Sequence, residues 1–156
     1  MQQALPQKVA TRSTARWLCP LAALTLLLLA AQFLIGMVVN LFVAVPDHPG
    51  TSASNYFVGV AQGVAWALGH NEWSLQLHVV LGLLLFLASL LLIGCAIAAR
   101  RRAWITISVI GWIGIMGAGF NGASFLNYGH NFSSLLMSVG FFLAMIAYVA
   151  GLFLAN

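Results

Sequence analysis

Three long stretches of this chain contain no charged side chain, and they decide what it can fold into. No Asp, Glu, Lys or Arg occurs at 17–46, 73–99 or 103–156. A helix needs about 20 apolar residues to cross the hydrocarbon core of a bilayer, so the first two stretches each hold one span and the third holds two. The third is interrupted once, by the polar segment Asn127–Asn131, which contains Gly129 and predicts a tight turn.

The chain is therefore predicted to be an all-α integral membrane protein, a four-helix bundle that forms a single membrane domain. The helices are expected at about 18–44, 74–98, 103–126 and 132–155. Only 5% of the residues are charged, against about 25% in soluble domains, which excludes a soluble enzyme. Six basic residues are too few for a nucleic-acid surface. We expect a multi-pass protein of the cell membrane, of the bacterial inner-membrane type, with the lipid bilayer as its main partner.

The positions of the charged side chains predict the orientation in the membrane. All Lys and Arg residues lie before the first predicted helix or between the second and third, whereas Asp47 and Glu72 lie between the first and second. Basic residues favour the cytoplasmic side. Both termini, including a tail at 1–16, and the Arg100–Arg102 loop are therefore predicted to be cytoplasmic, and the loop at 46–72 to face outward.

The outer loop contains an apolar segment that is expected to form a short helix on the membrane surface. Thr51–Ser54 offers residues that commonly cap a helix N-terminus, and Trp66 and Trp73 are expected at headgroup depth. Apolar residues recur along this segment at helical spacing: Phe57, Val60, Ala61, Val64 and Leu68.

Polar side chains inside the predicted spans are candidate functional residues, because they are costly in hydrocarbon and need partners. His78 lies 22 residues before Arg100, which is about 33 Å along a helix. Asn121 and Met137 lie at a comparable depth, and His130 lies in the turn just above. Imidazole nitrogen and thioether sulfur are axial ligands of haem iron, and helix bundles hold cofactors between facing helices. These residues form a candidate cofactor site for haem b, with His78 as the metal ligand.

Each of these residues also has a structural interpretation. A single histidine near a membrane interface commonly hydrogen-bonds a neighbouring helix or headgroup water, and a methionine in an apolar helix fills gaps. His130 would then be an exposed loop residue. Asn121 would hydrogen-bond between the third and fourth helices, as polar side chains do in lipid.

Small residues on the third predicted helix favour close packing against the fourth. Gly111, Gly114 and Gly117 follow one another at intervals of three, and such residues let helices approach closely in lipid. Ser134 and Ser138 share a face of the fourth helix that would suit this row of glycines.

The two halves of the chain share a layout, which predicts a two-helix internal repeat. A stretch with small residues precedes Asn40 in the first half and Asn121 in the second. In the returning helices, Leu77–Gly82 can be set against Leu135–Gly140.

The first half also resembles one half of the haem A synthase family over about residues 24–90. The resemblance is carried by Gln32–Gly36 late in the first helix, a Pro-Asp-x-Pro turn at Pro46–Pro49, the outer helix, and His78–Gly82. In that family such a histidine is a haem ligand, so the resemblance implies haem binding at His78. That family has eight helices, and this chain has half that number, so the resemblance implies a haem-binding relative. The second half is similar to small bacterial membrane proteins without an assigned activity.

Two functions are consistent with these features. One is a small haem-binding or redox-associated membrane protein with an outer-side site at His78. The other is an accessory or structural subunit, associated with other membrane subunits or with itself, that carries out no chemistry. A transporter is disfavoured because the predicted spans contain no ionised side chain.

Overall fold

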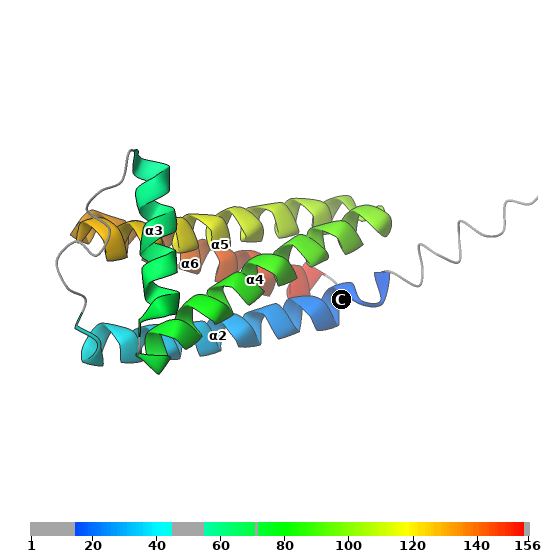
Figure 1. The fold of residues 1–156 in the computed structure, drawn as a ribbon. Coiled ribbons are helices and arrows are strands. Elements are labelled where there is room, and N and C mark those ends of the chain that lie inside the picture. The colour runs from blue at the N-terminus through cyan, green and yellow to red at the C-terminus, as the bar shows by residue number, and fades with distance from the viewer. Residues whose placement is uncertain (1–14, 45–54, 71, 155–156) are drawn as a thin grey trace, which may run out of the picture.

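The computed structural model describes residues 15–44, 55–70 and 72–154, and these are helical almost throughout (Figure 1). Within these ranges five helices follow in chain order: α2 (Leu18–Phe42), α3 (Tyr56–Gly69), α4 (Trp73–Ala98), α5 (Arg102–Tyr128) and α6 (Asn131–Leu154). The all-helical fold expected from the sequence is confirmed.

Four of these helices are long and apolar enough to cross a membrane. α2, α4, α5 and α6 contain 24 to 27 residues. At about 1.5 Å per residue each reaches about 36–40 Å, more than the roughly 30 Å of a bilayer's hydrocarbon core. Large apolar side chains point outward from all four, and Leu27, Leu34, Leu87 and Val139 are more than half exposed. These helices mark the chain as a multi-pass membrane protein that contacts lipid.

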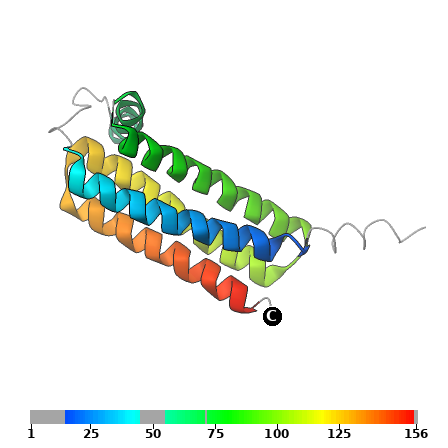
Figure 2. The same cartoon turned by 90° about the horizontal axis from the view of Figure 1, so that it is seen from below.

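The four long helices form a bundle in which each packs against two neighbours (Figure 2). α2 packs against α4 and α6, and α5 packs against the same two helices, so α4 and α6 occupy opposite corners. Leu29 of α2, Leu85 and Leu92 of α4, and Ala144 and Tyr148 of α6 are buried in the shared core. This arrangement decides which polar side chains can meet.

A close contact joins α5 to α6 through glycines. A Cβ atom added to Gly114 would lie 2.5 Å from the backbone oxygen of Gly140 and 2.8 Å from the backbone nitrogen of Ala144. A Cβ atom added to Gly111 would overlap the ring of Tyr148, which is fully buried. Gly111 and Gly114 therefore lie at the helix contact that the sequence predicted.

Gly117 takes part in this contact through its backbone, since its carbonyl carbon would lie 3.3 Å from a Cβ on Gly140, but a Cβ added to Gly117 itself would meet no atom within 4 Å. The α5 face that meets α6 passes through Gly114 and then Ala118, whose backbone nitrogen would lie 2.8 Å from a Cβ on Gly140. Gly117 is one residue off this row. The predicted serine row of α6 is also displaced, because Ser138 is exposed and donates a hydrogen bond of 3.1 Å to the backbone oxygen of Ser134.

The turn between α5 and α6 is shorter than expected. α5 continues through Tyr128, so the reversal is confined to Gly129 and His130. Gly129 adopts a left-handed backbone conformation (φ 67°), and its N–H donates to the backbone oxygen of Phe125 at 2.8 Å. Glycine adopts this conformation without steric cost, which explains why the helix ends there.

α3 runs crosswise to the bundle at the end where α2 finishes and α4 begins (Figure 1). Its N-terminus is capped by Asn55, whose side-chain oxygen accepts a hydrogen bond of 3.0 Å from the backbone N–H of Val58. The cap candidates Thr51–Ser54 lie outside the described residues. α3 approaches α5 closely, since a Cβ added to Gly63 would lie 2.9 Å from the backbone oxygen of Ala123.

The face of α3 that is buried against the bundle consists mostly of small residues. Gly59, Val60, Gly63 and Ala67 are its buried residues, and of the apolar row noted in the sequence Val60 is buried whereas Phe57 is 72% exposed. Small side chains allow α3 to lie directly on α5, so the large apolar ones point outward.

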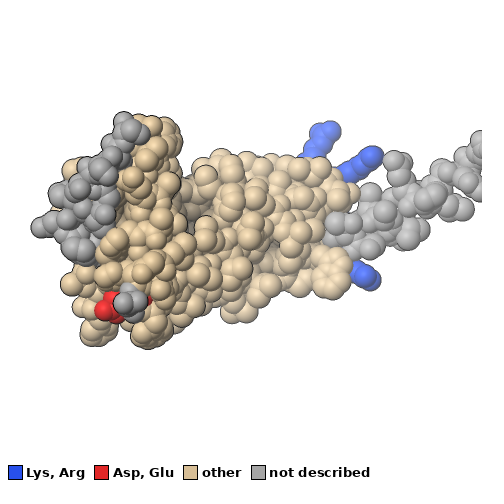
Figure 3. Space-filling view, in the orientation of Figure 1, with Lys and Arg blue, Asp and Glu red and all other residues tan. Residues whose placement is uncertain are grey.

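Charged side chains gather at opposite ends of the bundle (Figure 3). Arg16 precedes α2 and Arg100–Arg102 joins α4 to α5, whereas Glu72 precedes α4 at the other end. Arg100 adopts a left-handed conformation (φ 53°). The N–H groups of Arg100 and Arg101 donate to the backbone oxygens of Ile97 and Ala96 at 3.0 and 3.2 Å, the pairing of a Schellman helix end.

Candidate functional site

His78 lies in the second turn of α4 and meets Gln32 of α2. The Gln32 side-chain amide donates a hydrogen bond of 3.1 Å to the backbone oxygen of His78, and the same nitrogen lies 3.2 Å from His78 Nε2. Both residues are partly buried. The two helices are thus connected by polar contacts within an otherwise apolar region, where interhelical hydrogen bonds stabilise packing.

Glycines on both helices make room for this pair. A Cβ atom added to Gly36 would lie 2.9 Å from Cε1 of His78, and one added to Gly82 would lie 3.5 Å from Nε2 of Gln32. The imidazole therefore lies on the glycine of α2, and the amide lies on the glycine of α4. The two short motifs that carried the sequence resemblance, Gln32–Gly36 and His78–Gly82, face each other in the structure.

Two polar atoms of this pair have no hydrogen-bond partner although they are buried. They are Oε1 of Gln32 and Nδ1 of His78. Because the Gln32 amide nitrogen is the donor in both contacts, Nε2 of His78 acts as the acceptor and its ring proton resides on Nδ1. The site therefore presents one unpaired acceptor and one unpaired donor, a combination that a water molecule or another small polar group would satisfy.

The other predicted site residues make contacts on α5. The Asn121 amide donates a hydrogen bond of 2.8 Å to the backbone oxygen of Gly117 on its own helix, not across to α6 as predicted. The sulfur of Met137 lies 3.2 Å from where a Cβ on Gly122 would be, in the contact between α5 and α6. α6 is on the opposite corner of the bundle from α4, the helix that carries His78.

The outer histidines make ring contacts. His130 is exposed, and its ring stacks on Tyr128 with centroids 6.3 Å apart and an angle of 9° between the planes. His70 stacks on Trp66 at 4.4 Å. His48, in the outer loop, lies outside the described residues. The two described outer histidines thus each stack on an aromatic ring.

A fit with haem can be judged from these side chains. Axial ligation of haem iron uses an imidazole nitrogen whose lone pair is free toward the metal. Nε2 of His78 lies beside the Gln32 amide, Met137 packs on Gly122, and His130 stacks on Tyr128. Within the described ranges no group of three or more His, Cys, Asp or Glu residues could hold a metal ion. Haem ligation by His78 stays a prediction.

Sequence reasoning missed a hydroxyl and aromatic cluster beneath α3. The Tyr56 hydroxyl donates a hydrogen bond of 2.8 Å to Oγ of Ser124, which lies 3.3 Å from Oγ of Ser133. The Tyr56 ring stacks on Tyr128 at 5.4 Å with an angle of 10°. Gln32 was recognised only as part of the motif Gln32–Gly36 and not as a candidate site residue, although a glutamine inside an apolar span meets the same criterion that selected His78. Nothing in the sequence indicated a partner for Tyr56, because the residue that accepts its hydrogen bond, Ser124, is 68 residues further along the chain.

Comparisons with protein-family models, curated proteins and solved structures found no match for this chain. The resemblance to haem A synthase therefore rests on its motifs alone.

Proposed function

We propose that this chain is an accessory or structural subunit of the cell membrane, associated with other membrane subunits or with a second copy, and that it carries out no chemistry of its own. The observation that carries the proposal is the Gln32–His78 contact. The histidine that the spans contain is used to join α2 to α4, with its ring on Gly36 and its Nε2 beside the glutamine amide. Met137 also packs between helices, on Gly122 of α5, while Asn121 hydrogen-bonds the backbone of its own helix.

The proposed orientation has both chain termini in the cytoplasm. The described Arg residues lie at one end of the bundle, and Glu72 lies at the other. Basic-residue bias then assigns the Arg100–Arg102 turn to the cytoplasmic side and α3 to the outer surface. A reporter fused after Asn156 is expected to be cytoplasmic, and one inserted beside Ser54 external. The opposite pattern would overturn this orientation.

A two-helix repeat is proposed as the origin of the bundle. In the first half, His78 lies on Gly36, and in the second half, Met137 lies on Gly122. In each half a side chain near the start of the second long helix therefore rests on a glycine late in the first long helix. The two contacts are not at equivalent positions, because the alignment of the halves sets His78 against Leu136 and Gly36 against Gly117. The repeat is therefore proposed on the shared layout of the two hairpins.

Haem binding at His78 is the second candidate function. It is favoured by one observation, the buried Nδ1 of His78 that lacks a partner. In this alternative the ring proton moves to Nε2, where the Gln32 side-chain oxygen would accept a hydrogen bond from it, and Nδ1 would supply an axial ligand to iron.

Absorption spectra separate the two candidates. The full chain is purified in detergent after expression with haem in excess, together with His78→Ala and the matched control His130→Ala, whose ring is exposed. The accessory-subunit proposal expects no Soret band in any of the three proteins. A Soret band in the wild type that is lost in His78→Ala and kept in His130→Ala would overturn it in favour of haem binding.

The association itself is tested by native mass spectrometry of the full chain extracted from its own membranes. A second polypeptide, or a second copy, in fixed stoichiometry is expected. A chain that is monomeric under all mild extraction conditions would contradict the proposed role.

A further inference from the structure

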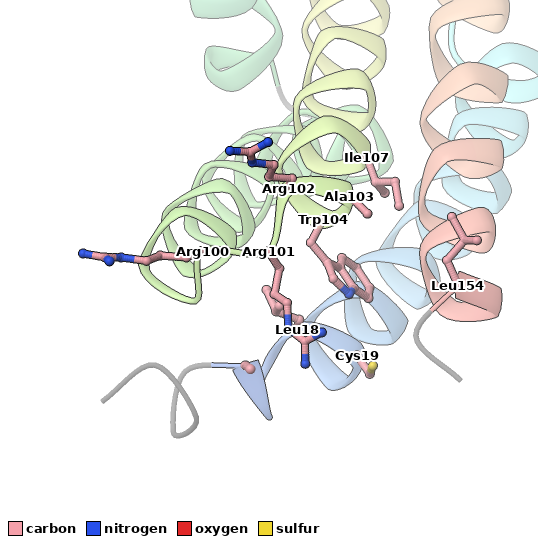
Figure 4. A pocket seen from close by; sticks show the side chains of 10 residues that line it. Leu18, Cys19, Arg100, Arg101, Arg102, Ala103, Trp104, Ile107 and Leu154 are labelled. Carbon is pink, nitrogen blue, oxygen red and sulfur yellow. The ribbon is translucent and has the colours of Figure 1, made fainter. Parts of the chain in front are cut away.

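A cavity opens at the arginine-rich end of the bundle. It lies where the start of α2, the turn from α4 to α5 and the end of α6 converge (Figure 4), and its volume is about 350 Å³. Known small-molecule pockets start at about 300 Å³, so the space suffices for a polar headgroup. The cavity is at the opposite end of the bundle from His78 and shares no residue with that site.

The polar lining of this cavity is cationic. Arg100, Arg101 and Arg102 all line it, and Figure 4 shows the Arg101 side chain directed toward Leu18 and Cys19 while the other two point outward. Glu72 is the one acidic residue in the described part of the chain, and it precedes α4 at the far end. No described carboxylate therefore neutralises these guanidinium groups.

The first turn of α5 adds a second attraction for anions. Arg101 is the N-cap residue of this 27-residue helix, and no side chain caps its free N–H groups. Arg102, Ala103 and Trp104, the first residues of the helix, line the cavity. An uncapped helix N-terminus presents backbone donors and a positive dipole end, which together favour a phosphate.

The remaining lining is apolar. Leu18, Ile107 and Leu154 come from α2, α5 and α6, and Trp104, only 8% exposed, lies among them. A site with guanidinium groups on one side and apolar side chains from membrane-spanning helices on the other matches an amphiphile better than a free anion. Arginine binds phosphate oxygens in a bidentate manner, and basic pockets between membrane helices bind anionic lipid headgroups.

We propose that this cavity binds the phosphate headgroup of an anionic phospholipid from the membrane leaflet at this end. The phosphate lies between Arg101 and the N-terminus of α5, and the acyl chains lie along Leu18, Ile107 and Leu154. The exposed Arg100 and Arg102 contact neighbouring headgroups. Bound lipid thereby supplies the counter-charge that the described protein lacks at this end.

The proposal is tested on the full chain in detergent by native mass spectrometry with added phosphatidylglycerol or phosphatidylcholine. Arg101→Gln is compared with Arg16→Gln, which removes the same charge at the same end but concerns a side chain that lies over Trp17 and does not line the cavity. We expect phosphatidylglycerol to bind in preference to phosphatidylcholine. Arg101→Gln should weaken that binding about five-fold or more, the effect of one basic residue at a membrane surface, and Arg16→Gln less than about two-fold.

A second variant tests whether weaker lipid binding is caused by misfolding. Arg100→Gly relieves the left-handed backbone at Arg100, so it is expected to melt at a higher temperature than the wild type and still bind phosphatidylglycerol more weakly. Equal binding of the two lipids, or equal losses in Arg101→Gln and Arg16→Gln, would overturn the proposal. So would full displacement of the lipid by inorganic phosphate at equal concentration, which would indicate a site for free phosphate.

Discussion

The contact between α5 and α6 predicts opposite effects for the same substitution at two glycines three residues apart. Gly114→Ala places a methyl group 2.5 Å from the backbone oxygen of Gly140 and 2.8 Å from the backbone nitrogen of Ala144. Because both neighbours are backbone atoms, no side-chain rotation can relieve the overlap, and the helices must separate. Gly117→Ala adds the same methyl group where no atom lies within 4 Å.

The magnitudes follow from two competing terms. Overpacking in a filled core costs about 1–3 kcal/mol, and replacing a helical glycine by alanine gains about 0.5–1 kcal/mol through the unfolded chain. Because a methyl group at Gly114 would displace two backbone atoms, its overpacking cost is taken from the upper end of the range of about 1–3 kcal/mol. Gly114→Ala is therefore expected to lower the free energy of unfolding by about 2 kcal/mol, and Gly117→Ala to raise it by about 0.5–1 kcal/mol.

The assay is reversible unfolding of both variants in mixed micelles with increasing dodecyl sulfate, followed by far-ultraviolet circular dichroism. Wild-type protein in the same micelles is the reference. Equal free energies for Gly114→Ala and Gly117→Ala, or a destabilised Gly117→Ala with an unchanged Gly114→Ala, would refute the described register of α5 against α6.

Three further predictions concern single contacts. A double-mutant cycle of Gln32→Leu and His78→Leu should give a coupling energy of about 0.5–1.5 kcal/mol in the same unfolding assay, and a coupling of zero would mean that the two side chains do not interact. Arg100→Gly should raise the free energy of unfolding by about 1 kcal/mol, since glycine carries no left-handed penalty, and a loss would contradict the φ of 53°. Tyr56→Phe should cost about 1 kcal/mol through its bond to Ser124, and unchanged stability would argue against that bond.

The four long helices could be predicted because hydrocarbon excludes charge residue by residue. Charge-free runs locate a span without knowledge of any partner, and the helix expected at 74–98 is observed at Trp73–Ala98. The glycines at 111 and 114 could be recognised for a similar reason, because small size is a local property that permits close packing.

The candidate site could not be assembled in the same way. Depth along a helix follows from counting residues, but which way a residue faces depends on the rotation of each helix about its axis. That rotation is set by contacts such as Met137 on Gly122, which no single sequence reveals. His78 and Met137 were expected at the same depth, but their helices occupy opposite corners of the bundle, and the partner of His78 is Gln32.

The crosswise course of α3 affects how the two halves of the chain stay together. By sequence α3 belongs to the hairpin of α2 and α4, yet Tyr56 and Gly63 attach it to α5 in the other hairpin. The Arg100–Arg102 turn joins the hairpins covalently at the opposite end. If the chain were divided within that turn, the first fragment would keep α3, and α3 would still contact α5 of the second fragment. Two separately synthesised fragments should then reassemble in a membrane, and a first fragment that lacks α3 should lose much of that ability.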